Sequence, residues 1–260
     1  MAQYTIGGDK YLANNKTIYE VVMLSDKDGN IINSFGSASN IPIADGTVTG
    51  YGHVNKFGGT DGDITAGTIW DGNNGAVTYP YPANGVVTVT STANTGAAVL
   101  IEGLDASFAS QSETVVIGGT GTKTFSRIFR ARMVDTNNDA DVVINQGGSI
   151  AAKIIEDQAQ TLMAVYTVPA GKTAYLIKVV MGSAKASTNS AMKYSLLARE
   201  TEDGNIFQFK GIYYAAGGQT LTMDYPVPLK FIEKTDIRID VTAAQQTEAS
   251  AIFDIILVDN

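Results

Sequence analysis

The chain has 260 residues, and its 18 Lys and Arg against 26 Asp and Glu leave a formal net charge of −8. Binding to nucleic acid needs a basic face that displaces counterions from phosphates, so we expect no nucleic-acid partner. With 44% hydrophobic and 17% charged residues, the chain has the composition of a protein with a buried core rather than of a disordered segment. Its length allows one large domain or two smaller ones.

The chain contains no cysteine, which excludes disulfides, thiolate nucleophiles and Cys-rich zinc sites. The N-terminal stretch MAQYTIGG lacks the basic and apolar regions of a signal peptide. The apolar run 175–181 is interrupted by Lys178 and falls short of the roughly 20 residues that cross a bilayer. We therefore expect a soluble chain that is made in the cytoplasm and has no membrane partner.

Apolar and polar residues alternate with a period of two along almost the whole chain, and Gly, Asn and Asp separate the short runs. This pattern predicts an all-β protein. Residues 1–46 are predicted to form an extended arm with one hairpin, whose strands are 19–24 and 31–35 around a turn at 26–30. The small polar residues 36–40 are expected to form a linker.

Two β-sandwich domains are predicted after the arm, at residues 47–147 and 148–260, and the second is expected to be jelly-roll-like. Strands of the first domain are expected at 85–92, 97–104, 113–117, 124–134 and 141–145. Strands of the second are expected at 161–168, 173–182, 192–199, 206–213, 220–225, 229–232, 236–242 and 252–258. The best helical window, residues 150–163, predicts at most one or two turns.

Catalytic motifs are incomplete in this sequence. The single histidine, His53, has no Gly-x-Ser-x-Gly motif elsewhere to partner it. Gly171-Lys172-Thr173 matches the end of a phosphate-binding loop, but Tyr166 stands where that loop needs Gly, so a β-turn between strands is favoured. The Gly-rich residues 118–122 are interpreted as a hairpin loop. We therefore expect neither enzymatic activity nor a cofactor.

A calcium loop is the strongest alternative among ion sites. Asp135, Asn137 and Asp139 place oxygen ligands on alternate positions, as a hard cation prefers. However, Ala140 stands where the calcium loop needs Gly, and Gln146 stands where it needs Glu. We predict no metal site, and the sequence leaves open whether an ion binds at these three residues.

One cluster of aromatic and polar residues has the composition of a sugar-binding surface. It spans residues 70–81, where the aromatic residues accompany Asp71, Asn73 and Asn74. The alternative interpretation is that Trp70 fills one end of the first sandwich. The candidate interface or ligand surface comprises Phe57, Trp70, Tyr79 and Tyr81.

Several stretches resemble a known group of proteins when they are taken together. They are VNKFG (54–58), IWDG (69–72), IEGLD (101–105) with ETV (113–115), and QTLMAVYTVPAGKTAY (160–175). This set resembles virion structural proteins of tailed bacteriophages, especially of marine and cyanobacterial phages, over about residues 50–180. The resemblance implies a multi-copy component of the particle, either a capsid decoration (cement) protein or a neck or tail protein. It transfers no functional residues.

The favoured function is therefore a decoration protein that bridges capsomers on a phage head. The alternatives are a neck, tail or fibre protein and a glycan- or receptor-binding module of the virion. The arm suits this role because an added strand joins neighbouring subunits through main-chain hydrogen bonds. Expected partners are copies of the chain itself, most simply as a trimer, and the major capsid protein, in a virion assembled in the host cytoplasm.

Overall fold

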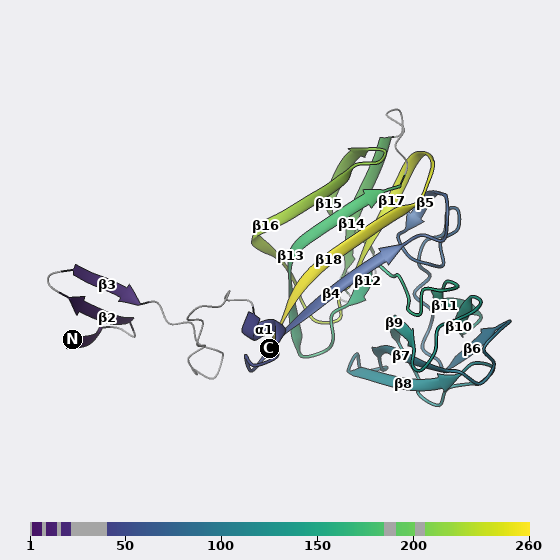
Figure 1. The fold of residues 1–260 in the computed structure, drawn as a ribbon, viewed down its shortest axis with the longest axis horizontal. Coiled ribbons are helices and arrows are strands. Elements are labelled where there is room, and N and C mark those ends of the chain that lie inside the picture. The colour runs from purple at the N-terminus through teal and green to yellow at the C-terminus, as the bar shows by residue number, and fades with distance from the viewer. Residues whose placement is uncertain (1, 7–8, 15–16, 22–40, 185–190, 201–205) are drawn as a thin grey trace.

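The computed structural model describes residues 2–6, 9–14, 17–21, 41–184, 191–200 and 206–260 (Figure 1). Strands account for 60% of the protein and helix for 2%, which confirms the all-β prediction. The described part of the chain contains one helix, α1 (Ile41–Ala44), of four residues. No helix in these ranges is long and apolar enough to cross a membrane.

The N-terminal strands form an antiparallel sheet of their own. Its order is β1 (Ala2–Ile6), β2 (Asp9–Asn14), β3 (Thr17–Val21). Two residues separate each strand from the next, as in tight hairpins, and these hairpins were not predicted from the sequence. The strand predicted at 19–24 overlaps β3, and the predicted turn, return strand and linker lie outside the described residues.

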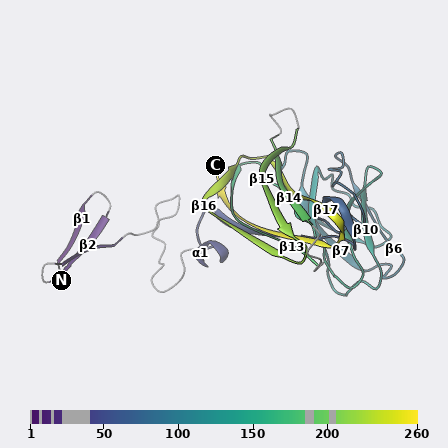
Figure 2. The ribbon, with the colours of Figure 1, turned by 90° about the horizontal axis from the view of Figure 1, so that it is seen from above.

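The larger sandwich consists of two antiparallel sheets that face each other (Figures 1 and 2). The first has the order β16 (Thr220–Phe231), β13 (Lys172–Ser183), β18 (Ala249–Asp259), β4 (Tyr51–Gly59). The second has the order β12 (Val165–Thr167), β17 (Asp236–Thr247), β14 (Ala191–Arg199), β15 (Gln208–Ala216), and β5 (Ile64–Thr68) also pairs with β17. Alternate residues of both sheets point inward, and the fully buried side chains between them include Ile64, Leu176, Tyr194, Ile239 and Phe253.

The smaller sandwich has two three-stranded sheets. One has the order β11 (Ser149–Ile154), β10 (Val142–Gln146), β6 (Val87–Ser91). The other has the order β8 (Ser110–Val116), β7 (Ala98–Leu104), β9 (Arg127–Met133). Residues 118–125 connect the two sheets instead of closing the predicted hairpin, because they leave β8 and bond to β6 and its flank. The core of this sandwich includes Trp70, Val89, Ile101, Phe125 and Ile144.

Strand pairing divides the chain differently from the predicted boundary at residue 147. β4 and β5 pair with β18 and β17, so the larger sandwich contains strands from both predicted domains. The smaller sandwich is therefore inserted between β5 and β12. The predicted boundary itself falls in the β10–β11 hairpin, where Gly147 and Gly148 take φ values of +57° and +82°. Sequence periodicity marks each strand but does not show which distant strand it joins.

β16 is one strand where two were predicted, at 220–225 and 229–232. Its pairing with β13 jumps from Asp224 to Leu229, so the intervening Tyr-Pro-Val-Pro segment bulges out of the ladder. Proline lacks the N–H that a central strand must donate, and it is tolerated here because β16 lies at the edge of its sheet.

Candidate functional site

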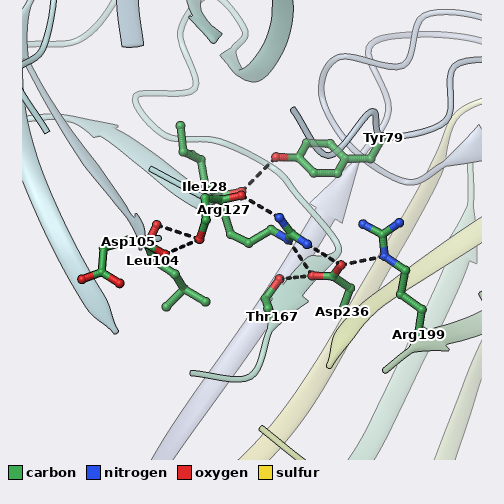
Figure 3. Close-up of polar contacts among 9 residues, drawn as sticks. Tyr79, Leu104, Asp105, Arg127, Ile128, Thr167, Arg199 and Asp236 are labelled. Atoms are coloured by element: carbon green, nitrogen blue, oxygen red, sulfur yellow. Dashed lines mark hydrogen bonds and ion pairs between the residues drawn. The ribbon is translucent and has the colours of Figure 1, made fainter. Parts of the chain in front are cut away.

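Asp236 of β17 links the two sandwiches (Figure 3). Its side chain is 2% exposed and accepts four hydrogen bonds. Arg127 of β9 donates two of them, from Nε to Oδ1 at 2.8 Å and from Nη2 to Oδ2 at 3.0 Å. Arg199 Nε donates to Oδ2 at 2.7 Å, and Thr167 Oγ1 donates to Oδ1 at 2.5 Å. A buried carboxylate is stable only when it is paired and hydrogen-bonded in this way.

The strand register explains this convergence. Thr167 and Arg199 are the residues paired with Asp236 on its two neighbouring strands, β12 and β14. Arg127 comes from the smaller sandwich, so only packing of the two sandwiches completes the set. Although burial disfavours its charged form, the hydrogen bonds to Asp236 raise the pKa of Arg127 above its ordinary value.

We call the contact formed by Arg127, Thr167, Arg199 and Asp236 the junction of the two sandwiches. Aromatic rings lie over its two arginines. The guanidinium carbon of Arg199 lies 4.4 Å from the ring centroid of Tyr81 and 4.6 Å from that of Phe207. The guanidinium carbon of Arg127 lies 5.2 Å from the ring centroid of Phe108. These are cation–π distances, and the rings also limit access of water to the carboxylate. Tyr81, predicted as part of a ligand surface, therefore packs within the junction.

Trp70 and Tyr79 are core residues, with exposed fractions of 1% and 2%. Their rings meet edge to face at 5.1 Å, and the Tyr79 hydroxyl lies 3.0 Å from the carbonyl oxygens of both Ile128 and Ala151. Neither ring is available to a sugar, so their predicted role in a ligand surface is wrong. Trp70 packs in the core of the smaller sandwich, as the alternative interpretation expected.

The polar residues next to Trp70 in the sequence form hydrogen bonds with the protein backbone. Asn73 is fully buried; its Nδ2 donates to the carbonyl oxygens of Ala66 and Thr68, and its Oδ1 accepts from Val77 N at 2.8 Å. Asp71 is also fully buried, and its Oδ2 accepts from the backbone N–H of Leu162 at 2.8 Å. Burial raises the pKa of Asp71 well above its usual range. Both residues therefore hold the loop after β5 rather than a ligand.

Phe57, the fourth candidate, lies elsewhere, at a cleft between the two sandwiches. The cleft has a volume of about 580 Å³ and is lined from β4, β12 and β13 on one side and from β7, β8 and β9 on the other. The structure thus brings Trp70, Tyr79 and Tyr81 together in one cluster of edge-to-face rings and leaves Phe57 apart from them.

Lys56, also on β4, is the cleft residue that sequence reasoning missed. It is 8% exposed, its Nζ donates to the backbone carbonyl of Phe129, and this nitrogen lies 5.5 Å from the Phe129 ring centroid. Burial, and then the positive charge of Arg130, lower the pKa of Lys56 to about 7. A lysine whose pKa lies this close to 7 is unusual for a residue with a purely structural role.

The predicted ion and phosphate motifs have local partners. Asp139 Oδ2 accepts from Asn94 Nδ2 at 2.8 Å, and Asn137 Nδ2 donates to Asp157 at 3.1 Å. Across the described ranges, no group of three or more His, Cys, Asp and Glu is arranged to hold a metal ion. Lys172 follows a turn in which its N–H donates to the carbonyl of Pro169, which confirms the β-turn interpretation.

A free edge of the larger sandwich is the most exposed apolar feature. Within the described residues, β15 pairs only with β14 and β16 only with β13, so both sheets end on the same side. The hydroxyls of Tyr213 and Tyr225 join these two edge strands. We call this region the β15–β16 edge; its exposed apolar residues are Phe209, Ile212, Tyr214 and Val227. In both views β16 lies on the opposite side of the two sandwiches from β6 (Figures 1 and 2).

Neither a protein-family model nor a curated protein matches this chain. Among solved structures, the broad bean stain virus structure aligns over 68% of this chain and 85% of its own, with 10% identity and a TM-score of 0.21. The VP2 subviral particle of infectious bursal disease virus aligns over 81% and 72%, with 13% identity and a TM-score of 0.21. The infectious bursal disease virus Gx strain structure aligns over 80% and 76%, with 10% identity and a TM-score of 0.19. Similarity at this level carries no argument about function.

Proposed function

We propose that this chain is a virion structural protein and, more specifically, a capsid decoration protein that bridges capsomers. The observation that carries the proposal is the β15–β16 edge. Phe209, Tyr214 and Val227 are 58%, 70% and 82% exposed there. Exposed apolar side chains on strands with a free edge are costly for an isolated protein and are commonly covered by a partner.

The edge also indicates where a partner binds. β16 carries two prolines and a bulge, devices that discourage another strand from pairing with it. β15 contains no proline, and among the described residues no strand pairs with its outer edge, so a neighbouring strand could bind there. We propose that the partner is another copy of this chain or the major capsid protein, and that copies of the chain associate as a trimer.

The buried junction supports a structural role. A subunit can bridge its neighbours in a particle only if its own domains keep a fixed arrangement. The Arg127–Asp236 pair and the aromatic rings around it supply such a connection between the two sandwiches. The β1–β3 sheet precedes this body in the chain, and we propose that it binds a neighbouring subunit. The proposal assigns no catalytic activity.

The experiment is a particle-binding assay with the purified chain and heads that lack it. We compare the full chain, a chain without residues 1–46, and a Phe209→Lys, Tyr214→Lys double variant. Both changes should reduce occupancy on heads while the far-UV CD spectrum remains that of a β protein. Occupancy equal to that of the full chain for both variants would reject the proposal. Binding restricted to necks or tails would favour the alternative, a neck, tail or fibre protein.

A further inference from the structure

Lys56 is the charged residue of the 580 Å³ cleft that has no ion-pair partner among the described residues. The other charged lining residues, and His53, each lie close to a group that can carry the opposite charge. Arg130 Nε lies 3.6 Å from Glu102, Lys172 pairs with Asp259, and the His53 ring accompanies Asp254 at 3.2 Å. Among the described residues, no carboxylate forms an ion pair with Lys56, whose one hydrogen bond goes to a carbonyl.

A nine-tenths buried ammonium without a counter-ion is rarely left so in a folded protein. The surrounding chemistry also suits an organic ligand. Apolar side chains, among them Val54, Phe129 and Leu257, line the cleft together with the hydroxyl-bearing residues Ser110 and Ser112. Sites for small molecules combine apolar walls with a few polar groups in this manner, and the volume lies within their usual range.

We infer that this cleft binds a carboxylate group carried on an organic body, with the Lys56 ammonium as its counter-ion. A monoanion is favoured because one ammonium in the cleft, that of Lys56, lacks an ion-pair partner among the described residues. A carboxylate alone would leave most of the cleft unfilled, so part of the ligand packs against the apolar walls. Two sources have this chemistry: a free carboxylic acid, and a glutamate side chain within a peptide. The inference does not depend on the proposed function.

Proton uptake distinguishes this binding from non-specific attraction. The charged groups that act on Lys56 are the cleft residues Arg130 and Glu102 and, outside the cleft, Asp71. The pKa of Asp71 is itself raised by burial. Because the pKa of Lys56 is about 7, roughly nine in ten of these side chains are neutral one pH unit above that value. A bound carboxylate favours the charged amine, so binding at that pH takes up nearly one proton.

The test is calorimetric titration of the full chain with acetate, with N-acetylglutamate methylamide and with the matching glutamine compound, in two buffers of different ionisation heat. The glutamate compound should bind saturably with proton uptake, and the uncharged glutamine compound should not bind. Acetate should bind more weakly than the glutamate compound, because it has no body to pack against the apolar walls, and equal binding would overturn that part of the inference. Butyrate, a free acid with an apolar body, separates the two sources: binding as tight as that of the glutamate compound would identify a free acid, and weaker binding would identify a peptide side chain.

Lys56→Met keeps the length of the side chain and removes its charge. It should weaken binding of the glutamate compound by about tenfold or more. The matched control is Lys178→Met, an exposed lysine of β13 outside the cleft, which should bind as the unaltered chain does. Absence of saturable binding by the unaltered chain, or equal binding by Lys56→Met, overturns the inference. The proton count on the unaltered chain keeps the test decisive even if Lys56→Met misfolds.

Discussion

Arg127 and Asp236 form a two-pronged ion pair across the junction of the two sandwiches, with nitrogen–oxygen distances of 2.8 and 3.0 Å. They are 109 residues apart in sequence. The planar guanidinium matches the planar carboxylate, a geometry that lysine does not reproduce. Because Arg199 and Thr167 share the same carboxylate, the pair also ties β9 to three strands of the larger sandwich.

Asp236→Ala should therefore be strongly destabilising. Its loss leaves Arg127 and Arg199, whose side chains are largely but not fully buried, next to each other without the carboxylate that pairs with both. Breaking one side of a buried ion pair typically costs about 3–5 kcal/mol. Urea unfolding measures this change in the free energy of unfolding. The control Asp224→Ala removes an exposed carboxylate, 3.6 Å from Lys178, and should change stability by about 0.5 kcal/mol or less. Equal stability of the two variants would contradict the account of the junction.

Two glycines of β4 test how closely this strand packs within the larger sandwich. A Cβ atom on Gly58 would lie 2.3 Å from Ala164 N and 2.6 Å from Ile69 O, whereas one on Gly52 would meet nothing within 4 Å. Gly58→Ala should cost about 1–3 kcal/mol by overpacking against backbone that cannot move aside. Gly52→Ala should be nearly neutral in the same thermal or urea unfolding experiment. A neutral Gly58→Ala would place β4 elsewhere.

Lys56 predicts how stability depends on pH. Its pKa falls from 10.5 in the unfolded chain to about 7 in the native protein. Between these values the unfolded state holds a proton that the native state lacks, so this residue makes stability rise with pH across that window. Below the native pKa the full cost of burying the charge remains. Lys56→Met should be more stable than the unaltered chain at pH 7 and should lose this rise. Unfolding free energies at several pH values measure both effects, and an unchanged slope would contradict the buried position of Lys56.

Local features of the fold could be predicted from the sequence, because alternation of apolar and polar residues is a local signal. The strand expected at 97–104 is Ala98–Leu104, and the one expected at 192–199 is Ala191–Arg199. The assignment of strands to sandwiches could not be predicted. β4 joins β18 across about two hundred residues, and no local pattern specifies that register.

The candidate site was less predictable, because aromatic composition does not distinguish a surface from a core. Trp70 and Tyr79 belong to the core of the smaller sandwich. The inward position of Lys56 could have been predicted. Lys56 lies two residues from both Val54 and Gly58, and alternate residues of a strand point to the same face, so the pattern predicts a lysine that faces inward. No comparable signal links Arg127 to Asp236, since only the folded chain brings the two residues together.

We propose that this chain is a multi-copy component of a virion, bound at capsomers. Quantitative mass spectrometry of purified particles tests this role, with the major capsid protein as the internal reference. The chain should be retained through purification and present in many copies, at a fixed ratio to the major capsid protein. Its absence from purified particles, together with its presence in the lysate, would show that it is not a structural component of the virion.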